Sequence, residues 1–325
     1  SNALVMRRSR VQFPPRAPLS SCFARPNLSL RLRYHFSVSN LLLNAMRPRQ
    51  WSKNFLIVVA PLTSGAVFNM EVWPTLVLAF LIFTLISSSI YLINDIFDRE
   101  LDRLHPKKRH RAIASGKLPV SIALSASFVL IVIALSAAAT QSSKSFLIVS
   151  GYLVISLFYS IHLKHIPILE ITIVALGFVM RVWFGASIVK APVSIWLGIS
   201  IFLGSTMIII AKRQTELSHH DRNFVRPVIL KYSDMALKAT GISVAVLLIL
   251  TFSLWTVFGQ EDLIEDRIFL YISCIPFSIA VGRFVYIAQS SGVEEPEEFL
   301  LSDHITQIVG VIFTILLTTG IFVNS

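Results

Sequence analysis

Charged residues and cysteines are scarce in this chain of 325 residues. Only 14% of the residues are Asp, Glu, Lys or Arg, whereas 54% are hydrophobic. A single soluble core cannot bury so many apolar side chains, so the composition predicts an integral membrane protein. The two cysteines, Cys22 and Cys274, are too few to suggest a disulfide framework or a zinc site.

Several common catalytic motifs are also absent. The sequence has no Gly-x-Gly-x-x-Gly, no phosphate loop ending in Gly-Lys-Ser/Thr, no Cys-x-x-Cys and no His-Glu-x-x-His. Acidic residues are missing from residues 1–45, which contain seven arginines; without that segment the formal net charge falls from +11 to +4. The remaining charge is explained by cationic loops beside anionic lipid and phosphate, so we expect no nucleic-acid partner.

Long apolar runs make up most of the remaining chain. Runs of roughly 17–25 apolar residues are long enough to cross a membrane. We predict nine such helices, at residues 55–70, 75–93, 119–140, 144–160, 166–187, 193–211, 235–258, 267–288 and 304–323. Pro61 and Gly65 interrupt the first, which is expected to tilt or to re-enter the membrane. The predicted fold is an all-α membrane bundle around a central cavity.

The loops predict how this bundle is oriented in the cell (inner) membrane. Lys and Arg accumulate in the loops after the second and sixth spans, whereas the alternate loops have few cations. Because cationic loops stay on the cytoplasmic side, these two loops are expected to be cytoplasmic. An odd number of spans then places the N-terminus inside and the C-terminus outside.

Three carboxylates directly follow the second span. Asp95, Asp98 and Asp102 are spaced three and four residues apart, so they fall on one stripe of a helix. Mg²⁺ takes oxygen ligands and commonly bridges one or two carboxylates to substrate phosphates, so this stripe predicts a diphosphate site. Cations that could bind phosphate follow at once, among them Arg109 and Arg111. The alternative is a solvated loop of mixed charge that closes a helix end.

The order Asn-Asp-x-x-Asp-x-x-x-Asp from Asn94 to Asp102 resembles the motif of the UbiA superfamily of intramembrane prenyltransferases. Further segments resemble one branch of it, the decaprenyl-phosphate phosphoribosyltransferases. These segments are Arg47-Pro48-Arg49-Gln50-Trp51-Ser52-Lys53-Asn54, Tyr159-Ser160-x-x-Leu163-Lys164-His165, Lys212-Arg213-x-x-Glu216-Leu217 and Glu295-Pro296-Glu297-Glu298. The resemblance implies a UbiA-like catalytic domain at 41–325, with the cavity open to the cytoplasm.

Residues 1–40 form a basic tail ahead of that domain. Ser1-Asn2-Ala3 is typical of residues left by an expression tag. The rest of the tail is Arg-rich and acid-free, as expected of a mis-assigned translation start, an organellar transit segment or an interfacial segment.

The resemblance also implies a reaction and its partners. The enzyme would transfer 5-phosphoribose from 5-phosphoribosyl 1-diphosphate to a polyprenyl (decaprenyl-type) phosphate and release diphosphate, with Mg²⁺ as cofactor. Asp95, Asp98 and Asp102 would be catalytic metal ligands, and Asn94 would orient the metal shell or a ribose hydroxyl. Apolar outer faces look the same against lipid or a neighbouring subunit, so a homo-oligomer is an open alternative.

Ten residues are expected to bind substrate. They are Lys53, Asn54, Arg109, Arg111, Tyr159, Lys164, Arg181, Lys212, Arg213 and Glu216. Simpler roles are open for several: Lys53 could anchor its span at the headgroups, and Tyr159 and Lys164 could be interfacial residues. Arg181 lies well inside the fifth span, where a charge needs a partner or a wet cavity. It would hold an acidic ligand, contact an anionic substrate or tie helices together.

The region around Lys212 departs from the superfamily pattern. Members that use a prenyl diphosphate carry a second pair of aspartates there, usually four residues apart, whereas this chain has a single Glu216 beside two cations. The departure counts against the first alternative, prenyl transfer from a diphosphate to an aromatic acceptor. The second alternative is a transporter or scaffold; acidic residues at one membrane face rather than mid-membrane count against it. Arg283, in the eighth span, is expected to pair with a glutamate at 294–298.

Overall fold

A computed structural model describes residues 38–218, 227–259, 267–290 and 303–323. Residues Leu41–Ser325 form one compact unit, and every regular element in its described part is helical. Residues 294–298 and the tail ahead of residue 38 lie outside the described ranges, so the predictions made for them stay predictions. The fold class predicted from the sequence is confirmed.

Eight helices in the described ranges are long and apolar enough to cross a membrane. They are α3 (Trp73–Phe97), α5 (Val120–Gln141), α6 (Ser143–Ile161), α7 (Leu169–Val189), α8 (Ile195–Ser218), α9 (Asp234–Phe258), α10 (Ile268–Ser290) and α12 (His304–Phe322). Each coincides with one of the nine predicted spans, to within a few residues at most ends. The protein is therefore a multi-pass membrane protein.

The first predicted span is not one long α-helix, so the count of nine was approximate. Residues 48–72 form a 3₁₀ segment η2 (Pro48–Val58), a short helix α2 (Val59–Thr63) and the single turns η3 (Ala66–Phe68) and η4 (Met70–Val72). Pro61 has no N–H for the helical ladder, and Gly65 adopts a positive φ of 76° directly after α2. These residues break the span where the sequence predicted an interruption.

A glycine fixes this broken segment against the bundle. A Cβ atom on Gly185 of α7 would lie 1.8 Å from the carbonyl oxygen of Ile57, so only glycine allows η2 to approach α7 so closely. Ile57 is fully buried with Phe83 of α3 and Phe184 of α7, whose rings lie 5.3 Å apart. Segment η2 therefore packs as an interior element, although its backbone is irregular.

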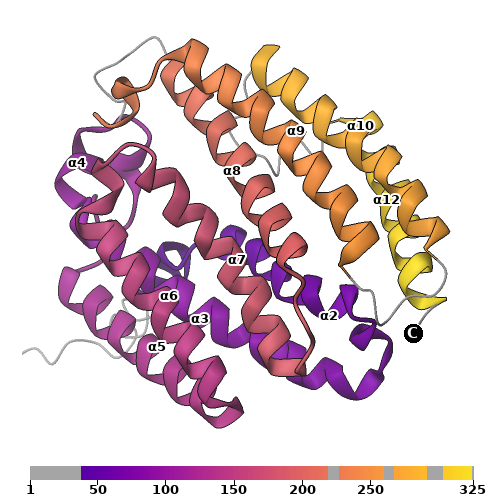
Figure 1. Ribbon diagram of the computed structural model, residues 1–325. Coiled ribbons are helices and arrows are strands. Elements are labelled where there is room, and N and C mark those ends of the chain that lie inside the picture. The colour runs from indigo at the N-terminus through magenta and orange to yellow at the C-terminus, as the bar shows by residue number, and fades with distance from the viewer. Residues whose placement is uncertain (1–37, 219–226, 260–266, 291–302, 324–325) are drawn as a thin grey trace, which may run out of the picture. The chain divides into compact units, whose positions relative to one another are not determined.

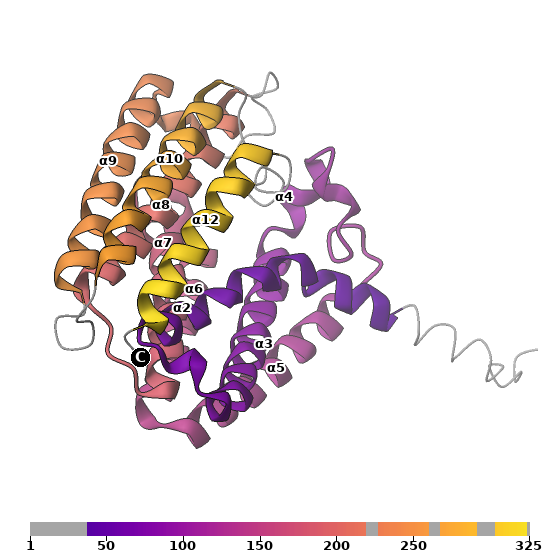
Figure 2. The same cartoon turned by 90° about the vertical axis from the view of Figure 1, so that its right-hand side faces the viewer.

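The long helices pack mainly against their neighbours in sequence (Figure 1). One buried cluster joins α3, α5, α6 and α7, and another joins α7 to α8, α9 and α10. Figure 2 shows α3 and α5 on one side of the bundle and α9 and α10 on the other. Helices α3, α6 and α8 end, and α5, α7 and α9 begin, at the end of the bundle where the short helix α4 (Arg99–Leu104) lies. We call this the α4 end.

Candidate active site at the α4 end

The three aspartates of the motif are buried at the α4 end. Asp95 lies in the last turn of α3, Asp98 follows α3 directly and Asp102 lies in α4. Their exposed fractions are only 3%, 8% and 4%. Helix α4 begins immediately after Asp98, whose N–H still donates to the Asn94 carbonyl, so the chain keeps a near-helical course through all three residues. The alternative of a solvated loop does not describe these side chains.

Each aspartate contacts a cation from a different part of the chain. Arg111 donates to Asp102 at 2.6 Å and contacts Asp95 at 3.3 Å. Arg47 contacts the same oxygen of Asp95 at 2.5 Å, and Lys164 pairs with Asp98. Burial of a carboxylate is costly unless it is paired, so the three cations account for the burial of the three acids. The cluster brings together the α3–α4 junction, the loop before α5, the loop after α6 and the residue before η2.

Arg47 is the member of this cluster that the sequence did not single out. From the same segment, Lys53 and Asn54 were predicted to bind substrate, and Arg47 was given no role in the site. Arg47 has a left-handed backbone with φ 57°, and its guanidinium lies 5.1 Å from the ring of Tyr91, one turn before Asp95 on α3. The Arg-Pro step before η2 was the available signal, but its partner on α3 is separated from it by 48 residues.

Asn94 completes the cluster with an unpaired acceptor. Its Nδ2 donates to Asp98 at 3.2 Å, while its Oδ1 is buried and has no hydrogen-bond partner. An unsatisfied buried oxygen beside three carboxylates is a ready ligand for a hard cation. No three Asp, Glu, His or Cys side chains converge on one point within the described ranges. Mg²⁺ does not require such convergence, because it keeps waters and shares substrate phosphates, so the oxygen donors present fit Mg²⁺.

A second buried ion-pair cluster lies at the same end, between α7 and α8. Arg213 makes a two-pronged contact with Glu170, with Nε–Oε1 and Nη2–Oε2 distances of 2.9 and 2.6 Å, and binds Glu216 at 2.6 Å. Tyr159, half-buried near the end of α6, interacts electrostatically with Arg213. Glu170 is only 1% exposed and was missed by the sequence reasoning. The signal was present, since Glu170 is an acid within an otherwise apolar run.

Tyr232 connects this second cluster to the loop that carries Lys164. The Ile168 N–H donates to the Tyr232 hydroxyl at 2.8 Å, and that hydroxyl lies 3.5 Å from Glu170. Burial raises the pKa of the Tyr232 phenol, which keeps it protonated. Ile168 is β-branched yet has a φ of 68°, a strained conformation that the Tyr232 contact helps to hold. The turn between Lys164 and α7 is therefore fixed at both ends.

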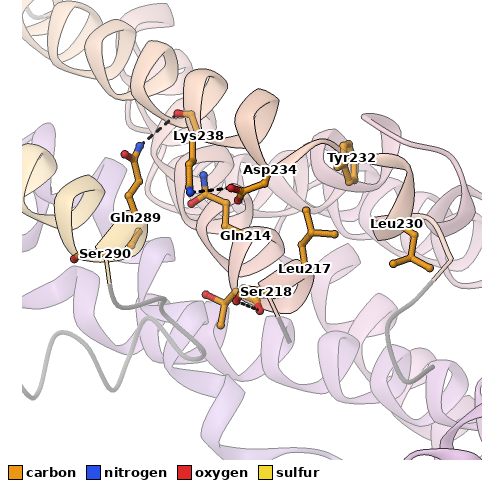
Figure 3. Close-up of a pocket in the computed structure, with 11 residues that line it drawn as sticks. Gln214, Leu217, Ser218, Leu230, Tyr232, Asp234, Lys238, Gln289 and Ser290 are labelled. Carbon is orange, nitrogen blue, oxygen red and sulfur yellow. Dashed lines mark hydrogen bonds and ion pairs between the residues drawn. The ribbon is translucent and has the colours of Figure 1, made fainter. Parts of the chain in front are cut away.

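A cavity of about 690 Å³ lies on the other side of Tyr232, between α8, α9 and α10 (Figure 3). Its wall includes Gln214, Tyr232, Lys238 and Gln289, of which Gln214 is buried. Lys238 pairs with Asp234 at 2.8 Å across the first turn of α9. Tyr232 thus lines this cavity and also contacts Glu170 of the buried pair.

Arg181 and Asn54 contact each other rather than the aspartates. Arg181 Nε donates to Asn54 Oδ1 at 2.9 Å, and its other nitrogens donate to the Gly177 carbonyl at 2.7 Å and the Tyr152 hydroxyl at 3.0 Å. Asn54 in turn donates to Thr84, which precedes Asp95 by eleven residues on α3, about 16 Å at 1.5 Å per residue. As predicted for a charge inside a span, Arg181 faces the interior, but these hydrogen bonds go to neutral groups.

Three more predicted substrate ligands lie outside the ion pairs described above. Lys53 is half-buried in η2. Arg109 is exposed, and its Nε lies 3.4 Å from the ring of His110. Lys212 is exposed on α8, and Glu216 pairs with Arg213 rather than with Lys212 across one turn. Of the ten predicted substrate ligands, Arg111 and Lys164 are the two that the structure places on the aspartates.

Arg283 also has a different partner from the one expected. It binds Asp303 through two contacts of 2.5 and 2.6 Å, and Asp303 also caps α12 by accepting from the Thr306 N–H. The Arg283 guanidinium holds the pKa of Asp303 well below its usual range. The glutamates at 294–298 lie outside the described residues. This pair ties α10 to α12, which is a structural role.

Long apolar helices with buried, ion-paired aspartates at one end, together with the match to a prenyltransferase family model, place this protein in the class of membrane-embedded transferases. The chain belongs to the UbiA prenyltransferase family, whose model matches residues 55–303.

Among its relatives is the decaprenyl-phosphate phosphoribosyltransferase of Corynebacterium glutamicum, which is 30% identical over 288 residues and matched over 87% of each chain. The Mycolicibacterium smegmatis protein of the same name is 34% identical over 281 residues, or 82% of this chain and 88% of the relative. A UbiA homolog from Archaeoglobus fulgidus, solved with GPP and Mg²⁺, matches 87% of this chain and 99% of its own, with a TM-score of 0.66 and 18% identity. That structural likeness establishes the fold.

Proposed function

We propose that this protein transfers 5-phosphoribose from 5-phosphoribosyl 1-diphosphate to a polyprenyl phosphate and releases diphosphate. Relatives of 30% and 34% identity over more than four-fifths of the chain carry the name of that activity, which supports the assignment. The structural observation that carries the proposal is the buried cluster of three aspartates, each paired with a cation.

This cluster has the charge pattern that a metal-bound diphosphate requires. Arg47, Arg111 and Lys164 neutralise the aspartates. Were a diphosphate and a divalent cation to bind here, both sets of partners would exchange: the carboxylates would hold the cation, and Arg111 and Lys164 would bind the phosphate oxygens. The buried charges remain compensated throughout this exchange.

Asp95, Asp98 and Asp102, with Asn94 Oδ1, would hold Mg²⁺, which when bound neutralises charge on the leaving diphosphate. The side chains of this protein supply the rest of the stabilisation. As the bond between the anomeric carbon and the diphosphate oxygen breaks, negative charge grows on the leaving group. Arg111 and Lys164 are preorganised donors for that charge.

The acceptor makes few further demands on the protein. Its phosphate is already an anion at neutral pH, so its oxygen can attack the anomeric carbon without a general base. The new carbon–oxygen bond forms as the old one breaks, and the electron pair leaves with diphosphate. The site must align the two substrates, and residues held in fixed positions around the cluster can do this.

The second cluster supports a sugar donor over a prenyl donor. Superfamily members that use a prenyl diphosphate carry a second pair of aspartates in this region. In the described part of α8, Glu216 is the one acid in the last turns of the helix, and it binds Arg213. A single acid in place of that pair favours the sugar donor.

A direct assay tests the proposal. The purified protein is incubated with Mg²⁺ and either 5-phosphoribosyl diphosphate plus decaprenyl phosphate, or a prenyl diphosphate plus 4-hydroxybenzoate. We expect a phosphoribosylated lipid and diphosphate in the first reaction and no product in the second. Prenyl transfer without phosphoribosyl transfer would replace this function with the alternative one.

A further inference from the structure

An apolar groove of about 530 Å³ lies between residues 42–46 and the first half of α5. It is lined by Leu42 and Met46 on one side and chiefly by Ile122, Ala126, Val129 and Leu130 on the other. The α5 residues form rows spaced four apart, which run along the helix. The hollow exists because Ser121, Ser125 and Ala126 are small.

The groove is one residue along the chain from the aspartate cluster. Met46, which lines the groove, is followed directly by Arg47, which contacts Asp95. The Met46 carbonyl accepts from Trp51 Nε1 at 3.3 Å and from Ser88 Oγ at 3.4 Å, so the backbone here is fixed to α3. A cation thus follows directly, in the chain, on a residue that lines an apolar groove beside the membrane-spanning helix α5. This arrangement is complementary to a lipid that has an anionic head and an apolar chain.

Arg47 can turn toward such a head without leaving an unpaired buried charge. Asp95 Oδ1 is contacted by both Arg47 and Arg111, so Asp95 keeps an ion-pair partner, shared with Asp102, when Arg47 moves. The Arg47 side chain is 28% exposed, whereas that of Asp95 is 4% exposed. Of these two side chains, Arg47 is the one that a ligand in the groove can reach.

We propose that the groove holds the isoprenoid chain of the anionic lipid acceptor and that Arg47 binds its phosphate. This inference rests on the proposed function, because it names where that reaction's acceptor lies. The chain then enters from the bilayer along α5, and its phosphate stands beside the diphosphate site. A single linear chain suits a groove that has one helix as its main wall, in contrast to a two-chain phospholipid.

Photocrosslinking tests the location without any need for activity. The full chain in lipid nanodiscs is irradiated with a photoreactive polyprenyl phosphate, and the labelled peptides are identified by mass spectrometry. We expect label within 121–130 or 41–46, reduced by excess decaprenyl phosphate and not by phosphatidylglycerol. Label confined to other helices, or equal competition by phosphatidylglycerol, would overturn the proposal; the latter would make the groove a site for bulk lipid.

A pair of substitutions on α5 tests the role of the groove in turnover. Ser125→Trp fills the hollow, and Leu124→Trp is the matched control, since Leu124 is 56% exposed on the same turn but does not line the groove. We expect Ser125→Trp to raise the apparent KM for decaprenyl phosphate at least about tenfold, because excluding even a few methylene groups costs that much affinity. The KM for the sugar donor should stay unchanged, as should both constants in Leu124→Trp.

The outcomes separate this inference from the proposed function. If no phosphoribosyl transfer occurs but the polyprenyl phosphate still labels the groove, the proposed function fails and the lipid site stands. If transfer occurs normally and Ser125→Trp behaves like Leu124→Trp, the function stands and the groove assignment is wrong. A KM effect with a ten-carbon prenyl phosphate as large as with decaprenyl phosphate would also count against the groove, because a short chain occupies little of it.

Discussion

Asp98 and Lys164 form a buried ion pair, so substituting either side chain also affects the stability of the protein. Their side chains are 11% and 7% exposed, so losing one leaves the other charge buried without compensation. A variant with lower activity could therefore be inactive because it is unstable. Any test of Asp98 as a metal ligand must separate the two effects.

We predict that Asp98→Asn destabilises the protein by about 3–5 kcal/mol, as expected when a buried pair is broken. The double variant Asp98→Asn with Lys164→Met should recover most of that stability, because it removes both charges. Diphosphate release should nevertheless fall at least about 100-fold in both variants, since the carboxylate acts in the transition state. Thermal unfolding in detergent and initial rates measure the two quantities. Activity that returns with stability in the double variant would show that Asp98 is structural.

Arg181 is expected to act through η2 rather than on substrate. It holds Asn54, and Asn54 follows Lys53 on the same segment. We predict that Arg181→Gln lowers stability by about 2–3 kcal/mol, because it leaves buried partners of a charged donor unsatisfied. The KM for the sugar donor should change little in the fraction that remains folded.

Arg47→Gln is the comparison for Arg181→Gln. Arg47 is partly exposed, so the substitution should cost less than about 1 kcal/mol. The apparent KM for decaprenyl phosphate should rise at least about tenfold, because the substitution removes a charge-assisted contact with the acceptor phosphate. A large change in donor KM for Arg181→Gln, with stability unaltered, would instead support a direct substrate contact at Arg181.

At the scale of elements, the position of η2 depends on one close backbone approach. We predict that Gly185→Ala destabilises the protein by about 1–3 kcal/mol, although alanine normally favours a helix, because its Cβ would overlap the Ile57 carbonyl. Gly198→Ala in α8 is the control, since the nearest atom to its Cβ would be 3.9 Å away. The melting temperatures of the two variants are compared, and that of Gly185→Ala should be lower. Equal melting temperatures would mean that η2 shifts freely.

The eight long helices could be predicted from the sequence because span length and hydropathy depend only on local composition. The irregular backbone of residues 48–72 could not be predicted in this way. Pro61 and Gly65 predicted an interruption, but the irregular segment is held by Gly185 and Arg181 of α7, more than a hundred residues away. Local sequence cannot identify such partners.

The candidate site shows the same division between local and distant information. The spacing of Asp95, Asp98 and Asp102 predicted one cluster, since it follows helical periodicity. The choice of Arg47 and Lys164 as partners depends on how the start of η2 and the end of α6 lie against α3, which periodicity does not encode. Glu170 was not predicted for the same reason, because its partner Arg213 is on α8 and the pair forms only when α7 packs against α8.

For the whole molecule, we expect the α4 end, and with it the candidate site, to face the cytoplasm. Residues 98–119, at the α4 end, contain seven Lys and Arg, whereas the connections at the opposite end carry single cations such as Lys144 and Lys190. Cationic loops stay in the cytoplasm, so the aspartates should open to the compartment that supplies a soluble sugar diphosphate.

We predict that a membrane-impermeant maleimide labels Arg109→Cys in inside-out vesicles but not in intact cells, and labels Lys144→Cys in the opposite pattern. Both side chains are exposed, so access depends on the membrane alone. Replacing Cys22 and Cys274 by serine removes background labelling. The two sites must label from opposite faces, because α5 lies between them and crosses the membrane once. Labelling of Arg109→Cys in intact cells would place the aspartates on the outer face, where a cytoplasmic donor cannot reach them, and the proposed reaction would then lack its cosubstrate.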